Sequence, residues 1–499
     1  MKNKITIDPI TRLEGHGKID IFLNDEGNVE KAFLQVPELR GFEKFSEGRL
    51  AEDMPQITSR ICGVCPSAHH LASTKALDDL YKVEPTEPAK IIRELFYNLH
   101  MFEDHVLHFY ILAGPDFIVG PDADKKDRNI LGVINTVGVE IGKKVIEIRK
   151  RTRDLMSEIG GKPVHPVFGL PGGVAKKVSE ETRKELKELS KDAIEFAKFT
   201  IDIFHKLVLD NKDYMDLILS DIYYHETYYM GMVDNNNKVN FYEGDIRVID
   251  PEGSELLKFQ PSEYLDVIGE HVEPWSYIKF PFLKAKGWQG FVDGKESGIY
   301  RVAPLARLNV SDGMATPLAD KEYKIMYETF GKKPVHNSLG IHWARLIETM
   351  YAAERFAELS ENEELCSDNI RNMELATPSE GIGIVEAPRG TLIHHYKTDE
   401  KGVITGCNLI VASLGNSAAM CMSVERAAKK LIKNGKVDDG LLNMVEMAFR
   451  AYDPCLGCAT HSLPGKMPLI VNLRNKKGKK ISSLIRDYNG KIQLNKFTY

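Results

Sequence analysis

The spacing of apolar residues predicts a mainly helical chain, with strands near its start and again before its end. Apolar residues that recur every three or four positions predict helices within residues 68–81, 87–112, 130–159, 179–223, 318–371, 423–434 and 438–450. Shorter helices are expected over 42–48 and 54–61. Apolar Ile19, Ile21 and Leu23 alternate with polar residues, which predicts two or three strands between residues 4 and 36. Further strands are expected over 381–409.

Two regions depart from the helical pattern. Between residues 232 and 310 the content of Gly, Pro and aromatic residues rises and the helical period fades, so we expect a β-rich or irregular excursion on the helical body. The last 38 residues, 462–499, carry nine Lys and Arg against one Asp and contain strand-like runs such as 467–471. This composition sets the tail apart from the rest of the chain.

Composition narrows the class of protein. A chain of 499 residues can bury a large core, and its length alone suggests about three domains. The net charge of −6 gives no basic face for nucleic acid, so no nucleic-acid partner is expected. The chain contains no stretch of about 18 apolar residues, so no membrane-spanning helix is expected. The first residues also lack the apolar core of a signal peptide.

The seven cysteines supply the first chemical signal. Two pairs have the Cys-x-x-Cys form, Cys62 with Cys65 and Cys455 with Cys458. One such pair could be a redox dithiol, half of a zinc site or chance, but two pairs can form a four-thiolate cage. Because 390 residues separate Cys65 from Cys455, a core site built by both halves of the chain fits better than a small structural zinc site. That zinc site stays the alternative. The other three cysteines are expected to be core thiols: Cys366, Cys407 and Cys421.

The residues around these pairs resemble a known family. The pairs lie in Arg60-Ile61-Cys62-Gly63-Val64-Cys65 and in Asp453-Pro454-Cys455-Leu456-Gly457-Cys458-Ala459-Thr460-His461. Further motifs are Asp8-Pro9-Ile10-Thr11-Arg12-Leu13-Glu14-Gly15-His16, Arg40-Gly41-Phe42-Glu43, Phe102-Glu103-Asp104-His105 and Glu386-Ala387-Pro388-Arg389-Gly390. Together they resemble the large, catalytic subunit of nickel–iron hydrogenases, most like the soluble cytoplasmic multi-subunit branch. The resemblance implies an α+β, mainly helical fold with a long-helix core, an N-terminal β hairpin and smaller β-rich excursions.

The resemblance implies three metals. Nickel would be held by all four thiolates of the two Cys-x-x-Cys pairs. An iron that carries cyanide and carbon monoxide would share Cys65 and Cys458 with the nickel. A magnesium ion would be held by Glu43, His461 and the carbonyl of Leu409, although a His nitrogen is a less usual ligand for this hard cation.

The resemblance also gives roles to acidic residues and to one arginine. Glu14 would pass protons between a nickel-bound thiolate and the exit path, which needs a partly buried carboxyl with a raised pKa. Without the resemblance, Glu14 would be taken as an exposed acid. Arg389 would lie above the open metal site, held by Asp104 and Asp453, because an unpaired buried charge is costly. An ordinary ion pair with a surface acid is the alternative for Arg389.

Other polar residues are expected around the metals. Ser413 would hydrogen-bond a cyanide, and Pro388 would also line the cofactor site. Ala412 stands where many relatives have Pro, so that wall of the iron pocket differs. His69 would donate to the bridging thiolate; the alternative is an ordinary buried histidine. His100, Asp104 and His108 share one helix face, and we interpret them as polar contacts around the site rather than as zinc ligands.

The implied function is that of an enzyme, a nickel–iron hydrogenase that cleaves H2 reversibly and heterolytically into protons and electrons. After four cysteines are used, three scattered ones cannot hold an iron–sulfur cluster, so an iron–sulfur small subunit is required. Further electron-transfer subunits would be heterodisulfide-reductase-linked or NAD(P)-linked, and the location cytoplasmic. One alternative is a hydrogen-sensing regulatory subunit. The other is a quinone-reductase core subunit of the complex I type, and retention of all four cysteines argues against it.

The same resemblance divides the chain at His461. Residues 1–461 would form a single large-subunit domain that includes the 232–310 excursion. Residues 462–499 would be a C-terminal propeptide that a maturation endopeptidase removes. The residues after His461, Ser462-Leu463-Pro464-Gly465, do not continue the motif.

Overall fold

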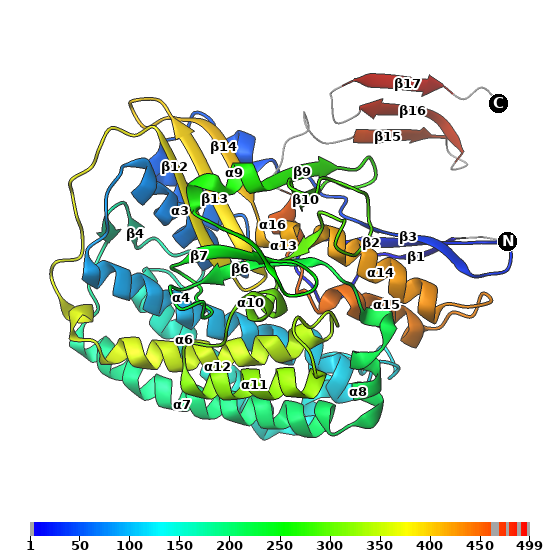
Figure 1. Ribbon diagram of the computed structural model, residues 1–499, viewed down its shortest axis with the longest axis horizontal. Helices are drawn as coiled ribbons and strands as arrows, with labels where there is room; N and C mark the ends of the chain where they lie inside the picture. Colours follow the sequence, from blue (N-terminus) through cyan, green and yellow to red (C-terminus); the bar gives the residue numbers. More distant parts are fainter. Residues whose placement is uncertain (1–3, 461–468, 476–478, 487–490, 497–499) are drawn as a thin grey trace.

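The structure, a computed structural model, describes residues 4–460, 469–475, 479–486 and 491–496. Long helices form one side of the molecule and small sheets lie on the other (Figure 1). The α+β, mainly helical class expected from the apolar spacing is confirmed.

The helical side is organised around α4 (Glu87–Leu107), which is buried along most of its length. α12 (Gly340–Glu361) packs against both α4 and α7 (Glu180–Phe204). α6 (Val139–Gly160) packs on α4, and α11 (Pro317–Phe330) packs on α12. This packing fixes the last turns of α4, including Asp104, in the interior of the protein.

A three-stranded antiparallel sheet covers α3 (Pro66–Leu80), the helix that begins directly after Cys65. Its strands are β12 (Glu380–Ala387), β13 (Gly390–Thr398) and β14 (Ile404–Ile410). Gly381 and Gly383 let β12 approach α3, because a side chain at either position would collide with the helix backbone. The β12–β13 hairpin turns at Pro388 and Arg389, and so directs Arg389 into a cavity that Cys65 also lines.

Smaller sheets surround this core. β1 (Lys4–Ile7), β2 (Lys18–Leu23) and β3 (Val29–Gln35) form an antiparallel sheet near the N-terminus. Between residues 228 and 301 the chain forms six strands: β6 (Tyr228–Val233), β7 (Asp245–Ile249), β8 (Glu255–Phe259), β9 (Ile268–Val272), β10 (Lys279–Leu283) and β11 (Tyr300–Arg301). They make one four-stranded sheet in the order β11–β6–β7–β8 and the pair β9–β10.

The remaining elements are short, and several of them position the site. The helices are α1 (Phe42–Ser46), α2 (Met54–Ser59), α5 (Ile130–Val137), α8 (Lys212–Leu219), α9 (Tyr264–Val267), α10 (Pro304–Val310), α13 (Ala412–Gly415), α14 (Ser417–Leu431), α15 (Asp439–Arg450) and α16 (Leu456–Ala459). β4 (Gly169–Leu170) and β5 (Gly173–Val174) form a small hairpin.

Three of the long predicted helices are broken in the structure. The helix expected over 87–112 becomes π-helical at His108–Ala113, and a second π-helical segment follows at Pro115–Val119. Gly138, with φ of 96°, separates α5 from α6 within 130–159. The region 179–223 divides after α7, where the Asn211 side chain accepts from the amides of Asp213 and Tyr214 and starts α8.

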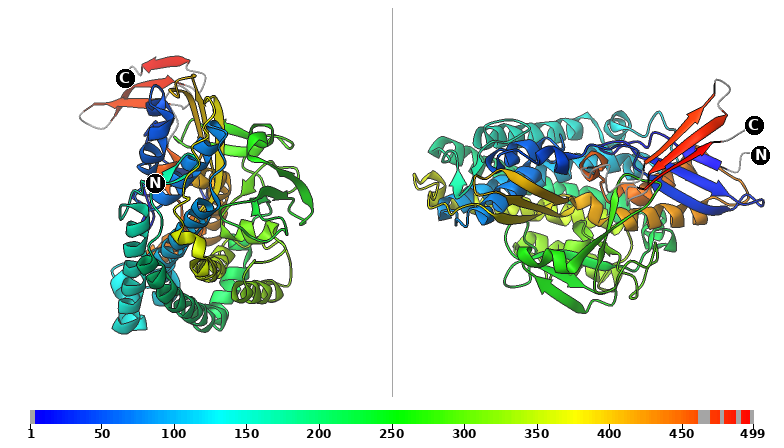
Figure 2. Two further views of the ribbon diagram at one scale, coloured as in Figure 1. Left: turned by 90° about the vertical axis from the view of Figure 1, so that its left-hand side faces the viewer. Right: turned by 90° about the horizontal axis from the view of Figure 1, so that it is seen from above.

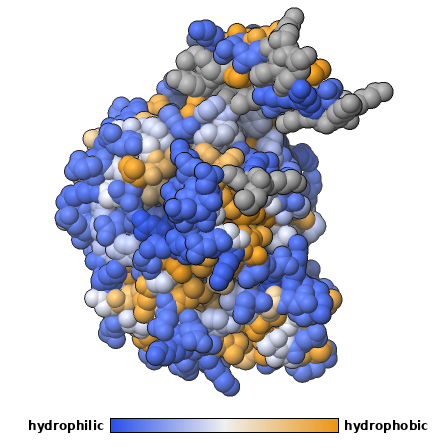
Figure 3. All heavy atoms as spheres, turned by 90° about the vertical axis from the view of Figure 1, so that its right-hand side faces the viewer, coloured by the Kyte–Doolittle hydropathy of each residue, from blue (hydrophilic) through white to orange (hydrophobic). Residues whose placement is uncertain are grey.

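The tail forms a separate antiparallel sheet of β15 (Leu469–Arg474), β16 (Lys480–Arg486) and β17 (Ile492–Lys496). It lies at the edge of the body, on the side of the N-terminal strands (Figures 1 and 2). Val471, Leu473, Ile492 and Leu494 are exposed on it, and Figure 3 shows apolar side chains on its surface.

Candidate metal centre

The two Cys-x-x-Cys turns meet in the interior. Cys62 and Cys65 lie between α2 and α3, and Cys455 and Cys458 lie at α16. The Cys62 and Cys455 sulfurs are 3.3 Å apart and those of Cys65 and Cys458 3.6 Å apart, and all four lie within 4.8 Å of one another. Among the described residues, none of the four cysteines forms a disulfide, and all four are buried. The set matches the donors that a soft, redox-active metal prefers.

The backbone and the neighbouring thiols favour negative charge at this cluster. The amides of Val64 and Cys65 point at the Cys62 sulfur, 3.1 and 3.4 Å away. Hydrogen bonds from Cys455, Cys458 and Cys65 hold the pKa of Cys62 well below its ordinary value of 9.0. Burial raises the pKa of the Cys458 thiol. Negative charge is thus favoured at Cys62, and a bound metal would hold the other three sulfurs as thiolates.

Glu14 contacts the second turn directly. Its carboxylate accepts hydrogen bonds from the Cys455 thiol at 3.0 Å and the Gly457 amide at 2.9 Å, and its carbonyl accepts from the Leu456 amide at 3.0 Å. Burial and the nearby Cys62 charge raise the pKa of Glu14. The structure therefore places a partly buried carboxyl against a cage sulfur.

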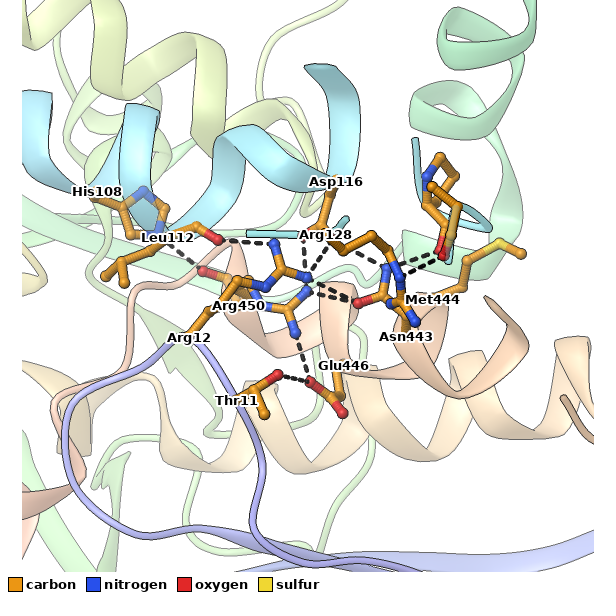
Figure 4. A network of polar contacts seen from close by, with 12 residues as sticks. Thr11, Arg12, His108, Leu112, Asp116, Arg128, Asn443, Met444, Glu446 and Arg450 are labelled. Carbon is orange, nitrogen blue, oxygen red and sulfur yellow. Dashed lines mark hydrogen bonds and ion pairs between the residues drawn. The ribbon is translucent and has the colours of Figure 1, made fainter. Parts of the chain in front are cut away.

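A buried polar network holds the segment that carries Glu14 (Figure 4). Arg12 has φ of 58°, which is unusual for a residue with a side chain, and its guanidinium donates to Asp116 at 2.6 Å, to Asn443 at 2.9 Å and to the Leu112 carbonyl at 3.0 Å. Arg450, the last residue of α15, donates to the other oxygen of Asp116 at 2.7 Å. One carboxylate thus joins the Glu14 segment to the helix that leads to Cys455.

Arg389 faces the four sulfurs from the turn between β12 and β13. Its Nη1 is 3.1 Å from Asp104 and its Nη2 2.9 Å from Asp453, and all three side chains are at most 2% exposed. Although burial acts to lower it, the pKa of Arg389 is kept above its ordinary value by these two carboxylates and by the negative sulfurs. The guanidinium is therefore held as a fixed positive charge beside the thiols.

A small cavity adjoins several of the sulfurs. Its lining combines apolar side chains with a few polar ones: Cys65, His69, Ala387, Arg389, Leu392, Val411, Ala412, Ser413, Cys455 and Cys458. The Ser413 hydroxyl accepts from the Cys455 amide at 2.9 Å, so its own proton remains available to a group in the cavity. Pro388 lies between two lining residues, and its carbonyl accepts from Arg307.

The remaining predicted residues lie around this core. Glu43 accepts from the Leu409 amide at 2.9 Å, whereas His461, the third proposed magnesium ligand, lies outside the described residues. His108 donates to the Arg450 carbonyl at 3.1 Å and is 3.8 Å from Asp453. His100 is buried, which lowers its pKa to about 4. Burial thus lowers the pKa of both histidines.

Comparison with known families identifies the fold. The family described as nickel-dependent hydrogenase matches residues 40–132 and 233–461, and one described as HoxL-like matches residues 4–39. The chain belongs to the nickel-dependent hydrogenase family. It is therefore an oxidoreductase of the nickel–iron hydrogenase type, and membership favours nickel over the zinc alternative.

Individual relatives agree with this assignment. The hydrogenase chain is 47% identical over 482 residues to an iron-sulfur subunit of the F420-non-reducing hydrogenase of Archaeoglobus profundus, covering 96% of this chain and 99% of that one. It is 36% identical to the NAD-reducing hydrogenase HoxS subunit beta of Cupriavidus necator, with 97% and 100% covered. A crystal structure of an NAD+-reducing [NiFe]-hydrogenase superposes with a TM-score of 0.86 at 36% identity, covering 92% of this chain and 99% of that one. Within the described residues, no helix of the hydrogenase is long and apolar enough to cross a membrane.

Sequence reasoning missed two groups at the hydrogenase centre. His69 contacts His394 at 3.1 Å, His394 contacts the Tyr396 hydroxyl at 2.6 Å, and that hydroxyl donates to Ser73 at 2.9 Å. This series of side-chain contacts orients His69 in the cavity wall. Arg40 contacts both cysteine turns. Arg40 stands in a quoted motif, so motif membership was the available signal for it, whereas His394 and Tyr396 lie four and six residues after Gly390, outside the quoted motif.

Proposed function

We propose that this hydrogenase chain is the catalytic subunit that cleaves H2 reversibly and heterolytically into protons and electrons. The observation that carries the proposal is that four buried thiols converge with a carboxyl and a guanidinium beside a small cavity, which Arg389 and three of the four sulfurs line. Each of these groups has a distinct chemical task in splitting a neutral, nonpolar molecule into charged products.

The thiols fit the metals that the family implies. Cys62, Cys65, Cys455 and Cys458 would hold nickel, and Cys65 and Cys458 would also hold an iron that bears cyanide and carbon monoxide. Such a pair of metals supplies the redox chemistry at which H2 is polarised and split. The adjoining cavity supports the iron assignment, because Leu392, Val411 and Ala412 offer apolar walls to small ligands while Ser413 and Arg389 offer donors.

Two side chains act on the products of the reaction: one transfers a proton and the other stabilises negative charge. Glu14 accepts the hydrogen bond of the Cys455 thiol, so its carboxyl can receive that proton and pass it outward. Arg389 holds positive charge at the cavity through Asp104 and Asp453, which stabilises negative charge as it develops there. His69, fixed by His394, is placed to orient a hydrogen bond in the same wall.

The electrons released from H2 must pass to partner subunits. We propose an iron–sulfur small subunit, with heterodisulfide-reductase-linked or NAD(P)-linked subunits beyond it, and a cytoplasmic location. The name of the NAD-reducing relative supports the NAD(P)-linked route, and the name of the F420-non-reducing relative leaves the heterodisulfide-reductase-linked route open. A magnesium ion held by Glu43, the Leu409 carbonyl and His461 remains part of the proposal.

Metal analysis of the purified complex tests this function. We expect nickel and iron in the wild type, H2-dependent reduction of a dye, and loss of both nickel and turnover in Cys62→Ser. Cys366→Ser is the control, because Cys366 lies away from the cage and should leave both unchanged. Zinc alone in the wild type, or full turnover in Cys62→Ser, would refute the proposal. Metals without dye reduction would favour a hydrogen sensor.

A further inference from the structure

Arg40 lies between the two cysteine turns, and the proposed reaction gives it no task. Its Nη1 donates both to the Ile61 carbonyl, which precedes Cys62, and to the Gly457 carbonyl at 3.1 Å. Its Nη2 donates to the Arg60 carbonyl at 3.4 Å. Gly457 lies inside the second turn, so one guanidinium joins peptide groups that are 396 residues apart in the sequence.

The segment around Arg40 also holds the end of the second turn. The amides of Arg40 and Gly41 both donate to the Thr460 carbonyl, at 2.9 and 3.3 Å. Gly41 has φ of 62°, which turns the backbone into α1 and brings the Phe42 ring under the guanidinium, 5.0 Å from its carbon. Backbone and side chain of this short motif therefore bind the same turn at two points.

Arg40 and Glu14 hold one residue, Gly457, by both of its backbone polar groups. The Gly457 amide donates to Glu14, and the Gly457 carbonyl accepts from Arg40. Charge-assisted hydrogen bonds of this kind are stronger than those between neutral groups. Lys could not replace the side chain fully, because its single ammonium lacks the planar fork that reaches three carbonyls.

We propose that Arg40 is a positioning residue that closes the two cysteine turns into one cage and thereby slows the loss of nickel. The inference rests on the proposed function for the identity of the metal. Arg40 is exposed and binds backbone carbonyls of the two turns, so its removal opens the cage locally and leaves the helical core folded.

The test compares Arg40→Gln with Arg60→Gln in the nickel-loaded complex. Arg60 is also exposed and adjoins the first turn, but its side chain makes no hydrogen bond or ion pair within the described part of the chain. Nickel release into EDTA is followed over time, and amide hydrogen exchange is measured in the same samples. We expect Arg40→Gln to release nickel at least about tenfold faster than the control, as loss of such hydrogen bonds implies. Exchange at residues 456–460 should rise, and that of α4 and α12 should not.

Equal nickel release or equal exchange in the two variants would overturn the inference, and so would faster exchange throughout the chain. If the glutamine variant does not assemble, Arg40→Lys is compared with Arg60→Lys by the same measurements and the same criteria. Nickel absent from the wild type would sink the proposed function instead. The exchange comparison on the metal-free chain would then still decide whether Arg40 closes the turns.

Discussion

At the residue scale, the centre depends on a few atoms through which residues of different sequence motifs contact one another. Glu14 carries the clearest case, because one of its oxygens accepts from both the Cys455 thiol and the Gly457 amide. Burial raises the pKa of this carboxyl. A carboxyl that exchanges its proton nearer to neutral pH is suited to relay protons from a sulfur.

Replacing Glu14 by Gln should therefore separate metal binding from proton movement. The amide keeps the shape of the side chain but cannot carry the proton, so nickel and iron content should stay at the wild-type level. Exchange between H2 and D2O should fall by about a hundredfold or more, the usual loss for a missing proton-transfer group. Mass spectrometry of the gas phase measures it. Wild-type exchange in the metal-loaded variant would show that protons leave by another route.

Gly457 offers a second test at this scale. A Cβ there would lie 2.6 Å from Glu14 Oε1 and 3.1 Å from Arg40 Nη1, so Gly457→Ala should push the carboxyl away from Cys455. Gly63 is the matched control, since it lies in the other Cys-x-x-Cys turn and a Cβ there meets nothing within 4 Å. We expect H2–D2O exchange to fall by about tenfold or more in Gly457→Ala, more than about 1.4 kcal/mol of barrier. Equal rates in Gly457→Ala and Gly63→Ala would contradict the geometry.

At the element scale, the long helices could be predicted from the sequence and their interruptions could not. The apolar period of α4 is strong, but apolar spacing does not distinguish α-helical from π-helical hydrogen bonds, which begin at His108. At the site, Glu14, Arg389 and the four cysteines were likewise predicted from their sequence motifs. Asp116 escaped notice because its partners, Arg12 and Arg450, are 104 and 334 residues away and meet it only through tertiary packing.

Asp116→Asn should show what this network contributes to the fold. The change leaves two buried guanidiniums without their shared carboxylate, and breaking such a buried pair costs about 3–5 kcal/mol. The melting temperature should drop clearly, whereas Lys143→Gln, which breaks an exposed pair with Glu140, should leave it nearly unchanged.

Although burial opposes them, Arg450 and Arg12 lower the pKa of Asp116. Its stabilisation should thus persist above the ordinary carboxyl pKa of 3.8 and disappear as the pH falls through the lower folded value. Equal melting temperatures for both variants would contradict this role.

At the scale of the whole molecule, both ends of the chain bear on the metal centre. The N-terminal motif supplies Glu14, and the end of the body supplies Cys455 and Cys458, while Arg40 binds the Thr460 carbonyl at the last described residue before the tail. The tail sheet lies at the edge of the body. The family match stops at residue 461, and 92% of this chain suffices to cover 99% of a solved relative. These observations support the proposed division of the chain at His461.

We predict that the active subunit ends at His461 and that residues 462–499 are removed during maturation. The second cysteine turn is already closed on Arg40 and Glu14 with the tail sheet present, so we expect removal of the tail to change the mass and charge of the subunit without moving the four sulfurs. The tail carries nine Lys and Arg and one Asp, so its loss should shift the net charge from −6 to −14, apart from the new terminus. Intact-mass measurement and isoelectric focusing of nickel-loaded, active complex would detect both changes. Asp487→Asn is a useful control, since it alters tail charge without touching the site of cleavage and should mature to the same mass. Active, nickel-loaded subunit that still ends at Tyr499 would overturn the processing prediction and the placing of His461 at a chain end.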